Sequence, residues 1–278
     1  MSISEKNIIA ARAAELSIAG EYALSTSKIL SPAEQVMFFE AVRGTGEASE
    51  RCFFYGGCAG AERRAALFLP SYIDFGGAPR ANSPFSAERE RFAITVMREY
   101  GITDEVGIVP LEINGSDYSS FTHRACMGSI LSLGLERDVV GDIAVLSSRS
   151  SVIFVSHTVA DFITENLTRI GRDAVKVKKA ALDDNFTIPR SFETFHLVCS
   201  SERLDGVAAA LANISRTAAK ELCLSGKADV NYVTHVQPDF RINTGDTVSV
   251  RGYGKFIIDS FDGETRSGRL RMTVRKYI

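Results

Sequence analysis

The sequence predicts an α+β protein built from three parts, and two observations carry this prediction. The middle of the chain alternates β-rich and helical segments in the order β-α-β-β-α-β, which is the split βαβ order of a ferredoxin-like α/β plait. Beyond it, two short amphipathic helices are followed by further β-rich runs. Because 278 residues suggest two or three domains, we place these parts at 1–85, 86–182 and 200–278.

Composition indicates an ordinary globular protein, with 45% hydrophobic and 24% charged residues. No apolar run has the length of a signal peptide or a membrane span, so we expect a cytoplasmic protein with no membrane partner. The five cysteines are odd in number and contain no Cys-x-x-Cys pair. We therefore expect reduced thiols that pack as small apolar residues, with no structural metal and no cofactor.

The first part predicts two helices and a hairpin. Apolar residues recur at helical spacing from Ile8 to Ala19. A second helix begins after Ser31, with Pro32 at its first position and Glu34 three residues after the cap. Two apolar runs, 52–55 and 65–69, flank a glycine-rich turn and predict a β-hairpin. Residues 76–86 have the composition of a connector.

The middle part predicts strands at 106–113, 138–148, 150–157 and 174–182, with helices at 122–134 and 158–172. The second helix is predicted from an apolar face that runs from Val159 through Leu167 to Ile170. RNA-recognition domains share this topology, but they stack bases on exposed aromatic residues of the central strands. Phe154 is the one aromatic residue of the second and third strands, and we favour a core position for it.

The last part begins after 183–199, which looks like a linker that becomes a strand. Leu204, Val207, Ala208 and Leu211 form the apolar face of a helix that Asn213 ends. A second helix follows Ser215 and is expected to bury Ala218, Ala219 and Leu222, before Gly226 stops it. We expect single strands at 228–233 and 246–256.

Charge is unevenly distributed along the chain. Residues 200–278 contain 12 Lys and Arg against 9 Asp and Glu, whereas residues 1–199 contain 20 against 25. Arg216 and Lys220 are four residues apart and share a helix face. A basic edge made by the helices and the strands after them fits a phosphate backbone, although scattered charges on a solvated face remain the alternative.

Three stretches of the chain resemble known families. "RLDGVAAALANISRTAAKELCLSGKADVN", with Gly245-Asp246 after it, resembles the S4 RNA-binding domain over 203–246, but departs from it at Asp229 and at Tyr232, which replaces a turn glycine. "YGGCAGAERRAALFLPSY" and "FTHRACMGSILSLGLERDVVGDIAV" are similar to two signature blocks of the bacterial YlmH family. This resemblance implies an N-terminal region, an α/β plait and a C-terminal S4 domain. It also implies ribosomal RNA and tRNA as ligands at the large ribosomal subunit, in rescue or quality control of stalled translation.

These observations give two sets of candidate site residues. The first set is expected to contact RNA through phosphates and riboses: Arg203, Ser215, Arg216, Lys220, Lys227, Asn231, Arg251 and Lys255. The second set could contact RNA or order the local structure: Arg63, His123, Arg124, Arg137 and Asp142.

An enzyme is the main competing interpretation. His123 and Asp142 could form an acid–base pair, and some pseudouridine synthases carry a catalytic aspartate in an Arg-Leu-Asp triplet like the one that contains Asp205. However, no nucleophile elbow, metal-ligand pair or P-loop is present, and Asp205 suits the first turn of a helix. We therefore predict a monomeric RNA-binding protein without catalysis. The alternatives are an RNA-modifying enzyme targeted by its S4 domain, and a protein-interaction adaptor with a degenerate S4 domain.

Overall fold

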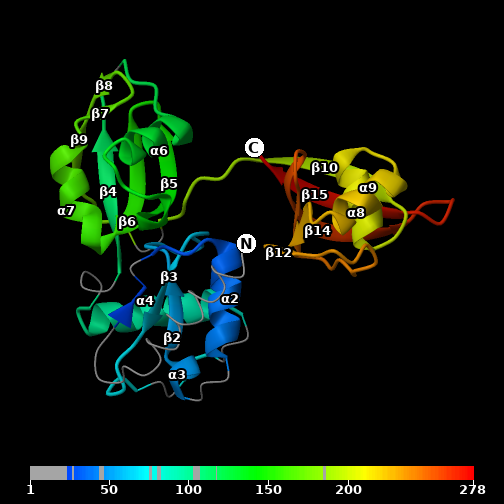
Figure 1. Ribbon diagram of the computed structural model, residues 1–278, viewed down its shortest axis with the longest axis horizontal. Helices are drawn as coiled ribbons and strands as arrows, with labels where there is room; N and C mark the ends of the chain where they lie inside the picture. The colour runs from blue at the N-terminus through cyan, green and yellow to red at the C-terminus, as the bar shows by residue number, and fades with distance from the viewer. Residues whose placement is uncertain are drawn as a thin grey trace. The chain divides into compact units, whose positions relative to one another are not determined.

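The computed structural model describes residues 24–26, 28–43, 47–74, 77–79, 83–102, 107–116, 118–183 and 186–278. The chain divides into two compact units, Met1–Pro189 and Arg190–Ile278, and each is described by itself (Figure 1). The helix predicted around Ile8–Ala19 lies outside the described residues. Within the described residues, no helix has both the length and the apolar character needed to cross a membrane.

Helix α2 (Pro32–Val42) confirms the predicted capping pattern. The Ser31 hydroxyl accepts a hydrogen bond from the Glu34 amide, and the Glu34 carboxylate accepts one from the Ser31 amide at 2.7 Å. The helix packs on an antiparallel sheet of order β1-β3-β2, formed by Leu24–Ser25, Ala65–Phe68 and Cys52–Tyr55. Phe38 places its ring 6.2 Å from the rings of Phe54 and Phe68, so helix and hairpin share one apolar core.

The plait follows helix α3 (Glu47–Glu50) and helix α4 (Ala87–Glu99). Its elements are β4 (Ile108–Asn114), α6 (His123–Leu131), β5 (Val140–Ser147), β6 (Ser150–Ser156), α7 (His157–Asn166) and β9 (Lys176–Lys179), with a 3₁₀ turn, η1 (Arg137–Val139), before β5. The sheet order is β5-β6-β4-β9, and every pair is antiparallel. The β-α-β-β-α-β order predicted from the sequence is therefore confirmed.

Helix α7 is shorter than the sequence predicts. It ends at Asn166, and the chain continues into a small pair of strands, β7 (Arg169–Ile170) and β8 (Asp173–Ala174). Leu167 and Ile170 are buried, but from this extended segment rather than from the helix face. Leu167 follows the helix and Ile170 lies in β7, so their burial does not come from helical periodicity, and the predicted extension to 172 was wrong.

The second face of the plait sheet is covered by the N-terminal elements. Phe154 of β6 is completely buried, in a cluster that contains Tyr55 and Leu67 of the hairpin and Met97 of α4. Gly57 lies directly over the Phe154 ring with φ +92°, and a Cβ at this position would come within 2.3 Å of the ring. Only glycine fits this close approach. The core position preferred for Phe154 is confirmed.

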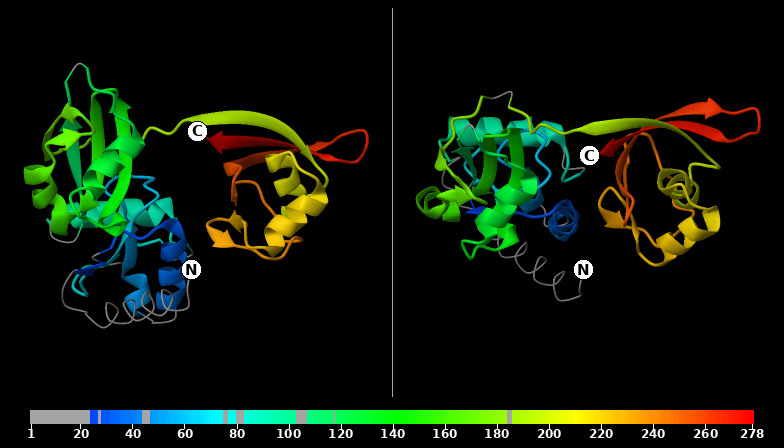
Figure 2. Two further views of the ribbon diagram at one scale, coloured as in Figure 1. Left: turned by 45° about the horizontal axis from the view of Figure 1, so that its top comes forward. Right: turned by 90° about the horizontal axis from the view of Figure 1, so that it is seen from above.

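The C-terminal unit is a six-stranded antiparallel sheet of order β10-β15-β14-β13-β11-β12. In chain order the strands are Phe192–Cys199, Ala228–Val230, Val233–Thr234, Thr247–Val250, Gly254–Glu264 and Leu270–Tyr277. Helices α8 (Leu204–Ala212) and α9 (Arg216–Leu224) lie on the same side of this sheet (Figures 1 and 2). Their buried residues, with Val207 and Ala219 among them, form one cluster with the strand residues that point towards them.

Two single strands predicted in this unit are each divided by a turn. Asn231 and Tyr232 both have positive φ, at 49° and 68°, and they turn the chain from β11 into β12. Hairpin turns of this kind require positive φ at both central residues, which usually selects glycine or asparagine. Because Tyr232 is neither glycine nor asparagine, the sequence does not indicate this turn. Likewise, residues 251–253 separate β13 from β14.

Candidate nucleic-acid interface

A buried carboxylate joins two arginines at the start of the helix pair. Asp205, in the first turn of α8, has a side chain that is 4% exposed. It accepts hydrogen bonds from Nε and Nη2 of Arg216 at 3.1 and 3.2 Å, and from Nε and Nη2 of Arg203 at 3.3 and 3.4 Å. The arginine side chains are 46% and 49% exposed. One fixed anion therefore positions two partly exposed guanidinium groups.

The helix connection creates this arrangement. Asn213 takes the left-handed conformation at the end of α8, with φ 52°, and the chain reverses within three residues. The Ser215 hydroxyl then accepts a hydrogen bond from the Ala218 amide at 3.2 Å and caps α9. Arg216 is the first residue of α9, and the reversal returns it to the first turn of α8.

Electrostatics keep the carboxylate ionised. Burial acts to raise the pKa of Asp205, but the hydrogen bonds and charges of Arg216 and Arg203 outweigh it, and the pKa is lowered. Each guanidinium has five N–H donors in a planar fork, and the Asp205 contacts use one edge of each. The remaining donors suit a second anion, such as a phosphate.

Lys220 extends this cationic area along α9. It lies one turn after Arg216 and is exposed. We call Arg203, Arg216 and Lys220 the helix-pair surface. Lys227 follows the helix directly after Gly226, and its carbonyl accepts a hydrogen bond from the Arg251 amide at 2.9 Å. The structure therefore brings Lys227 and Arg251 together where β11 begins and β13 ends.

Two of the eight residues predicted to contact RNA, Asn231 and Lys255, contact residues of the sheet and its turns rather than the helix pair. The Asn231 amide donates to the Asp246 carboxylate at 2.8 Å, and its carbonyl accepts from the Thr247 backbone at 3.0 Å. Lys255 alternates with buried Phe256 on β14, so it points to the sheet face opposite the helices. Its ammonium group lies 4.0 Å from the ring centroid of Tyr277.

Three residues of the second set hold the hairpin turn against β5. Asp142 accepts hydrogen bonds from the backbone amides of Glu62 and Arg63, at 2.6 and 3.4 Å. The Arg63 guanidinium donates to the carbonyls of Ile29 and Val140, and Arg137 also donates to Val140. Burial lowers the pKa of Arg63, and it lowers the pKa of Arg137 to about 10. These contacts are structural.

The remaining two residues of that set begin helix α6. His123 and Arg124 are exposed, and the helix is capped by Thr122, whose hydroxyl accepts a hydrogen bond from the Ala125 amide at 3.1 Å. Asp142 is occupied by the two backbone amides of the hairpin turn. Among the described residues, no group of three or more His, Cys, Asp or Glu side chains could hold a metal ion.

Comparisons with known proteins identify the family. Residues 103–184 match a family model described as "Putative RNA-binding domain in YlmH". A curated protein of Bacillus subtilis (strain 168), named "Ribosome-associated protein quality control protein P2", is 30% identical over 257 residues, which is 92% of this chain and 88% of that protein. The chain belongs to the YlmH family. A solved structure titled "Cell division protein ylmH from Streptococcus pneumoniae" is 19% identical, with a TM-score of 0.45, and covers 65% of this chain and 93% of its own.

In this YlmH-family chain, the matched region has three exposed lysines, Lys176, Lys178 and Lys179, on edge strand β9. Phe154 cannot stack on a base because the Gly57 turn covers it. Lys178 pairs with Glu112 at 3.0 Å, and Lys179 pairs with Asp161 at 2.9 Å.

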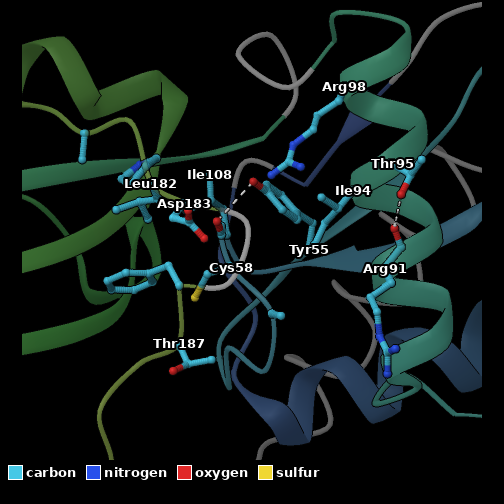
Figure 3. A pocket seen from close by; sticks show the side chains of 15 residues that line it. Tyr55, Cys58, Arg91, Ile94, Thr95, Arg98, Ile108, Leu182, Asp183 and Thr187 are labelled. Carbon is cyan, nitrogen blue, oxygen red and sulfur yellow. Dashed lines mark hydrogen bonds between the residues drawn. The ribbon is translucent and has the colours of Figure 1, made fainter.

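A cavity of about 590 Å³ lies in the N-terminal unit of this YlmH-family chain, and sequence analysis did not find it. Figure 3 shows Arg91 and Arg98 of α4 on one side and Leu182 and Asp183 on the other. The Tyr55 hydroxyl within it donates to the Gly57 carbonyl at 3.3 Å. The volume lies in the range of small-ligand sites. Its walls come from distant segments, so no local sequence pattern predicts it.

Proposed function

We propose that this protein binds structured RNA of the large ribosomal subunit, or tRNA bound there, and acts in quality control of translation without catalysis. Its Bacillus subtilis relative is named a ribosome-associated quality control protein. The C-terminal unit resembles an S4 domain over residues 203–246, and the family model adds an RNA-binding description for 103–184. Because ribosomes work in the cytoplasm, we propose that compartment as well.

The observation that carries this proposal is the shared contact of Arg203 and Arg216 with Asp205. Ordering a long arginine side chain normally costs conformational entropy when it binds a ligand. Here the buried carboxylate orders both side chains beforehand, and the outward edges of the guanidinium groups remain partly exposed. Lys220 adds a third cation one turn away. This spacing of charges suits successive phosphates of a folded RNA backbone.

The plait would contribute through its edge rather than its centre. The matched region places Lys176, Lys178 and Lys179 on edge strand β9, and all three are exposed. The face on which a base would stack is instead used to pack the hairpin turn. We therefore assign the plait a phosphate-contacting role that depends on charge more than on base sequence.

Two observations favour binding over an RNA-modifying reaction. Asp205 is only 4% exposed, and both of its carboxylate oxygens accept hydrogen bonds from two arginines, which leaves little access for a substrate. Asp142 is engaged by two backbone amides. Both carboxylates therefore have structural partners that account for their positions.

The test is crosslinking of the full chain to RNA in cells, followed by sequencing of the bound RNA. We expect ribosomal RNA or tRNA from wild type, and strongly reduced recovery from an Arg216→Ala, Lys220→Ala double variant. Glu88→Gln, which alters an exposed acid in the other unit, is the control. Recovery of one site whose base modification depends on this protein would instead establish an enzyme. Recovery of no RNA would support the adaptor.

A further inference from the structure

The C-terminal sheet has a second face, opposite the two helices. On β10 and β15 the residues that point to the helices include buried Cys199, Met272 and Val274. Alternation places the residues between them on the other face. The outward residues of these strands include exposed His196 and Arg271. No helix of the C-terminal unit covers this face (Figure 2).

Aromatic rings and cations follow one another across this face. Lys255 places Nζ 4.0 Å from the ring centroid of Tyr277 and 5.2 Å from that of Tyr232. The Tyr277 ring meets that of Phe192 at 4.8 Å, and Arg275 lies 4.9 Å from the same Phe192 ring. We call these five residues the aromatic row. It joins β14, β15, β10 and the β11–β12 turn, which are separate in sequence.

Cations and acids both lie on this face. Lys255, Arg275 and Arg271 supply three cations. Asp259 is held by Arg275 through contacts of 2.7 to 3.0 Å, and Asp229 accepts a hydrogen bond from the Thr234 hydroxyl. Asp262 also lies on this face and accepts hydrogen bonds from the Ser260 and Thr273 hydroxyls. The charges of this face are therefore balanced, and its distinguishing feature is the contact of cations with aromatic rings.

We propose that the aromatic row binds an unpaired segment of RNA. Proteins that bind single strands combine aromatic side chains, on which bases stack, with cations that follow the phosphates. The helix-pair surface has only the second of these components, because its three residues are all cations. The row has both. This inference rests on the proposed function in taking RNA as the ligand, but it assigns the contact to a different surface.

The test uses the full chain and a fluorescein-labelled oligouridylate of about 12 nucleotides, a length within the range of known single-strand sites. Tyr277→Ala should weaken its binding by roughly 5- to 100-fold, because one stacking partner is lost. Tyr277→Phe keeps the ring and should bind nearly as wild type does. Lys255→Gln should reduce the slope of log affinity against log salt by about 0.7.

Lys276→Gln is the matched control. Lys276 is adjacent to Tyr277 and also lies over a ring, that of Phe256 at 5.6 Å, but on the helix side of the same strand. Its loss should leave oligouridylate binding within about twofold of wild type. Equal losses from Lys255→Gln and Lys276→Gln, or wild-type binding by Tyr277→Ala, would overturn the proposal. If Tyr277→Ala does not fold, the comparison of the two lysine variants decides alone.

A parallel titration with an RNA hairpin separates this proposal from the proposed function. Arg216→Ala should weaken hairpin binding much more than oligouridylate binding, and Tyr277→Ala should do the reverse. If Arg216→Ala weakens RNA binding and Tyr277→Ala does not, the proposal for the aromatic row is overturned and that for the helix-pair surface is retained. If Tyr277→Ala weakens RNA binding and Arg216→Ala does not, the proposal for the helix-pair surface is overturned.

Discussion

Arg216, the first residue of helix α9, donates hydrogen bonds from Nε and Nη2 to both carboxylate oxygens of Asp205 in helix α8. This contact links the stability of the helix pair to the shape of its cationic surface. Arg203, the residue immediately before α8, donates hydrogen bonds to the same carboxylate. We therefore expect a substitution at any of the three positions to change the stability of the unit and, under the proposed function, RNA binding as well.

Asp205→Asn should destabilise the protein by about 1–3 kcal/mol, because the buried position would lose its charge-assisted hydrogen bonds. Urea unfolding followed by circular dichroism measures this change. Asp239→Asn removes the same charge from an exposed position of the same unit, and it should stay within about 0.5 kcal/mol of wild type. Similar unfolding midpoints for both variants would contradict a structural role for Asp205.

Arg216→Ala and Lys220→Ala should differ in stability although both weaken RNA binding. Sequence alone predicts two equivalent surface residues. The structure predicts that Arg216→Ala also costs about 1 kcal/mol or more, because it removes two of the hydrogen bonds to a buried carboxylate. Each variant should lower the salt slope of RNA binding by roughly one. Thermal unfolding of both variants beside a salt titration checks the two parts separately.

Acid should remove the Asp205 contribution to stability. The folded pKa of Asp205 is lowered, so its contribution is complete above the unfolded pKa of about 3.9 and is lost as the pH falls through the folded pKa. Wild type should therefore lose its advantage over Asp205→Asn as the pH falls from about 5 to below 3. Unfolding midpoints of both proteins across this range provide the measurement. Because other carboxylates titrate in both proteins, the difference between them is the quantity to follow, and a constant difference would refute the assignment.

Gly57→Ala should destabilise the N-terminal unit by several kcal/mol. The added methyl group would clash with the Phe154 ring, and the residue would also keep a positive φ. Gly60→Ala has positive φ as well, but no atom lies within 4 Å of its new Cβ, so it should cost only about 1 kcal/mol. Comparison of the two melting temperatures isolates the clash from the backbone strain, and equal losses would argue against close packing of Phe154.

A fragment of residues 190–278 should fold better than one of residues 200–278. Strand β10 pairs with β15 along its full length, from Phe192 to Cys199. The shorter fragment lacks this strand and exposes the edge of β15, which is a site for aggregation. Size-exclusion chromatography and the chemical-shift dispersion of amide protons in NMR spectra compare the two fragments. Equal dispersion would show that β10 is dispensable.

Local rules account for much of what could be predicted from the sequence. Ser31 and Glu34 were sufficient to predict the start of α2 because a capping box involves neighbouring residues. The alternation of apolar residues likewise located the plait strands. Helix α7 shows the limit of this approach, since burial of Leu167 and Ile170 depends on the strands that they meet rather than on their own spacing.

The candidate site was predictable only in part, for the same reason. The basic residues of the helix pair were recognisable from their spacing and from the S4 pattern. Their joint contact with Asp205 requires the reversal at Asn213, which brings together residues that are eleven positions apart. The position of Lys255 beside Tyr277 depends on strand register, which no local pattern supplies.

The pairing of β10 with β15 also sets how the C-terminal unit responds to mechanical load. The strands are antiparallel, with Phe192 opposite Tyr277, and the Ile278 amide donates to the Ser191 carbonyl at 3.1 Å. The unit's first and last strands therefore enter and leave the sheet at the same end. Tension between residue 190 and residue 278 would open this ladder one hydrogen bond after another, like a zipper, instead of shearing all of them at once. The unit should yield at low force when pulled by these two points, while its helix pair remains folded.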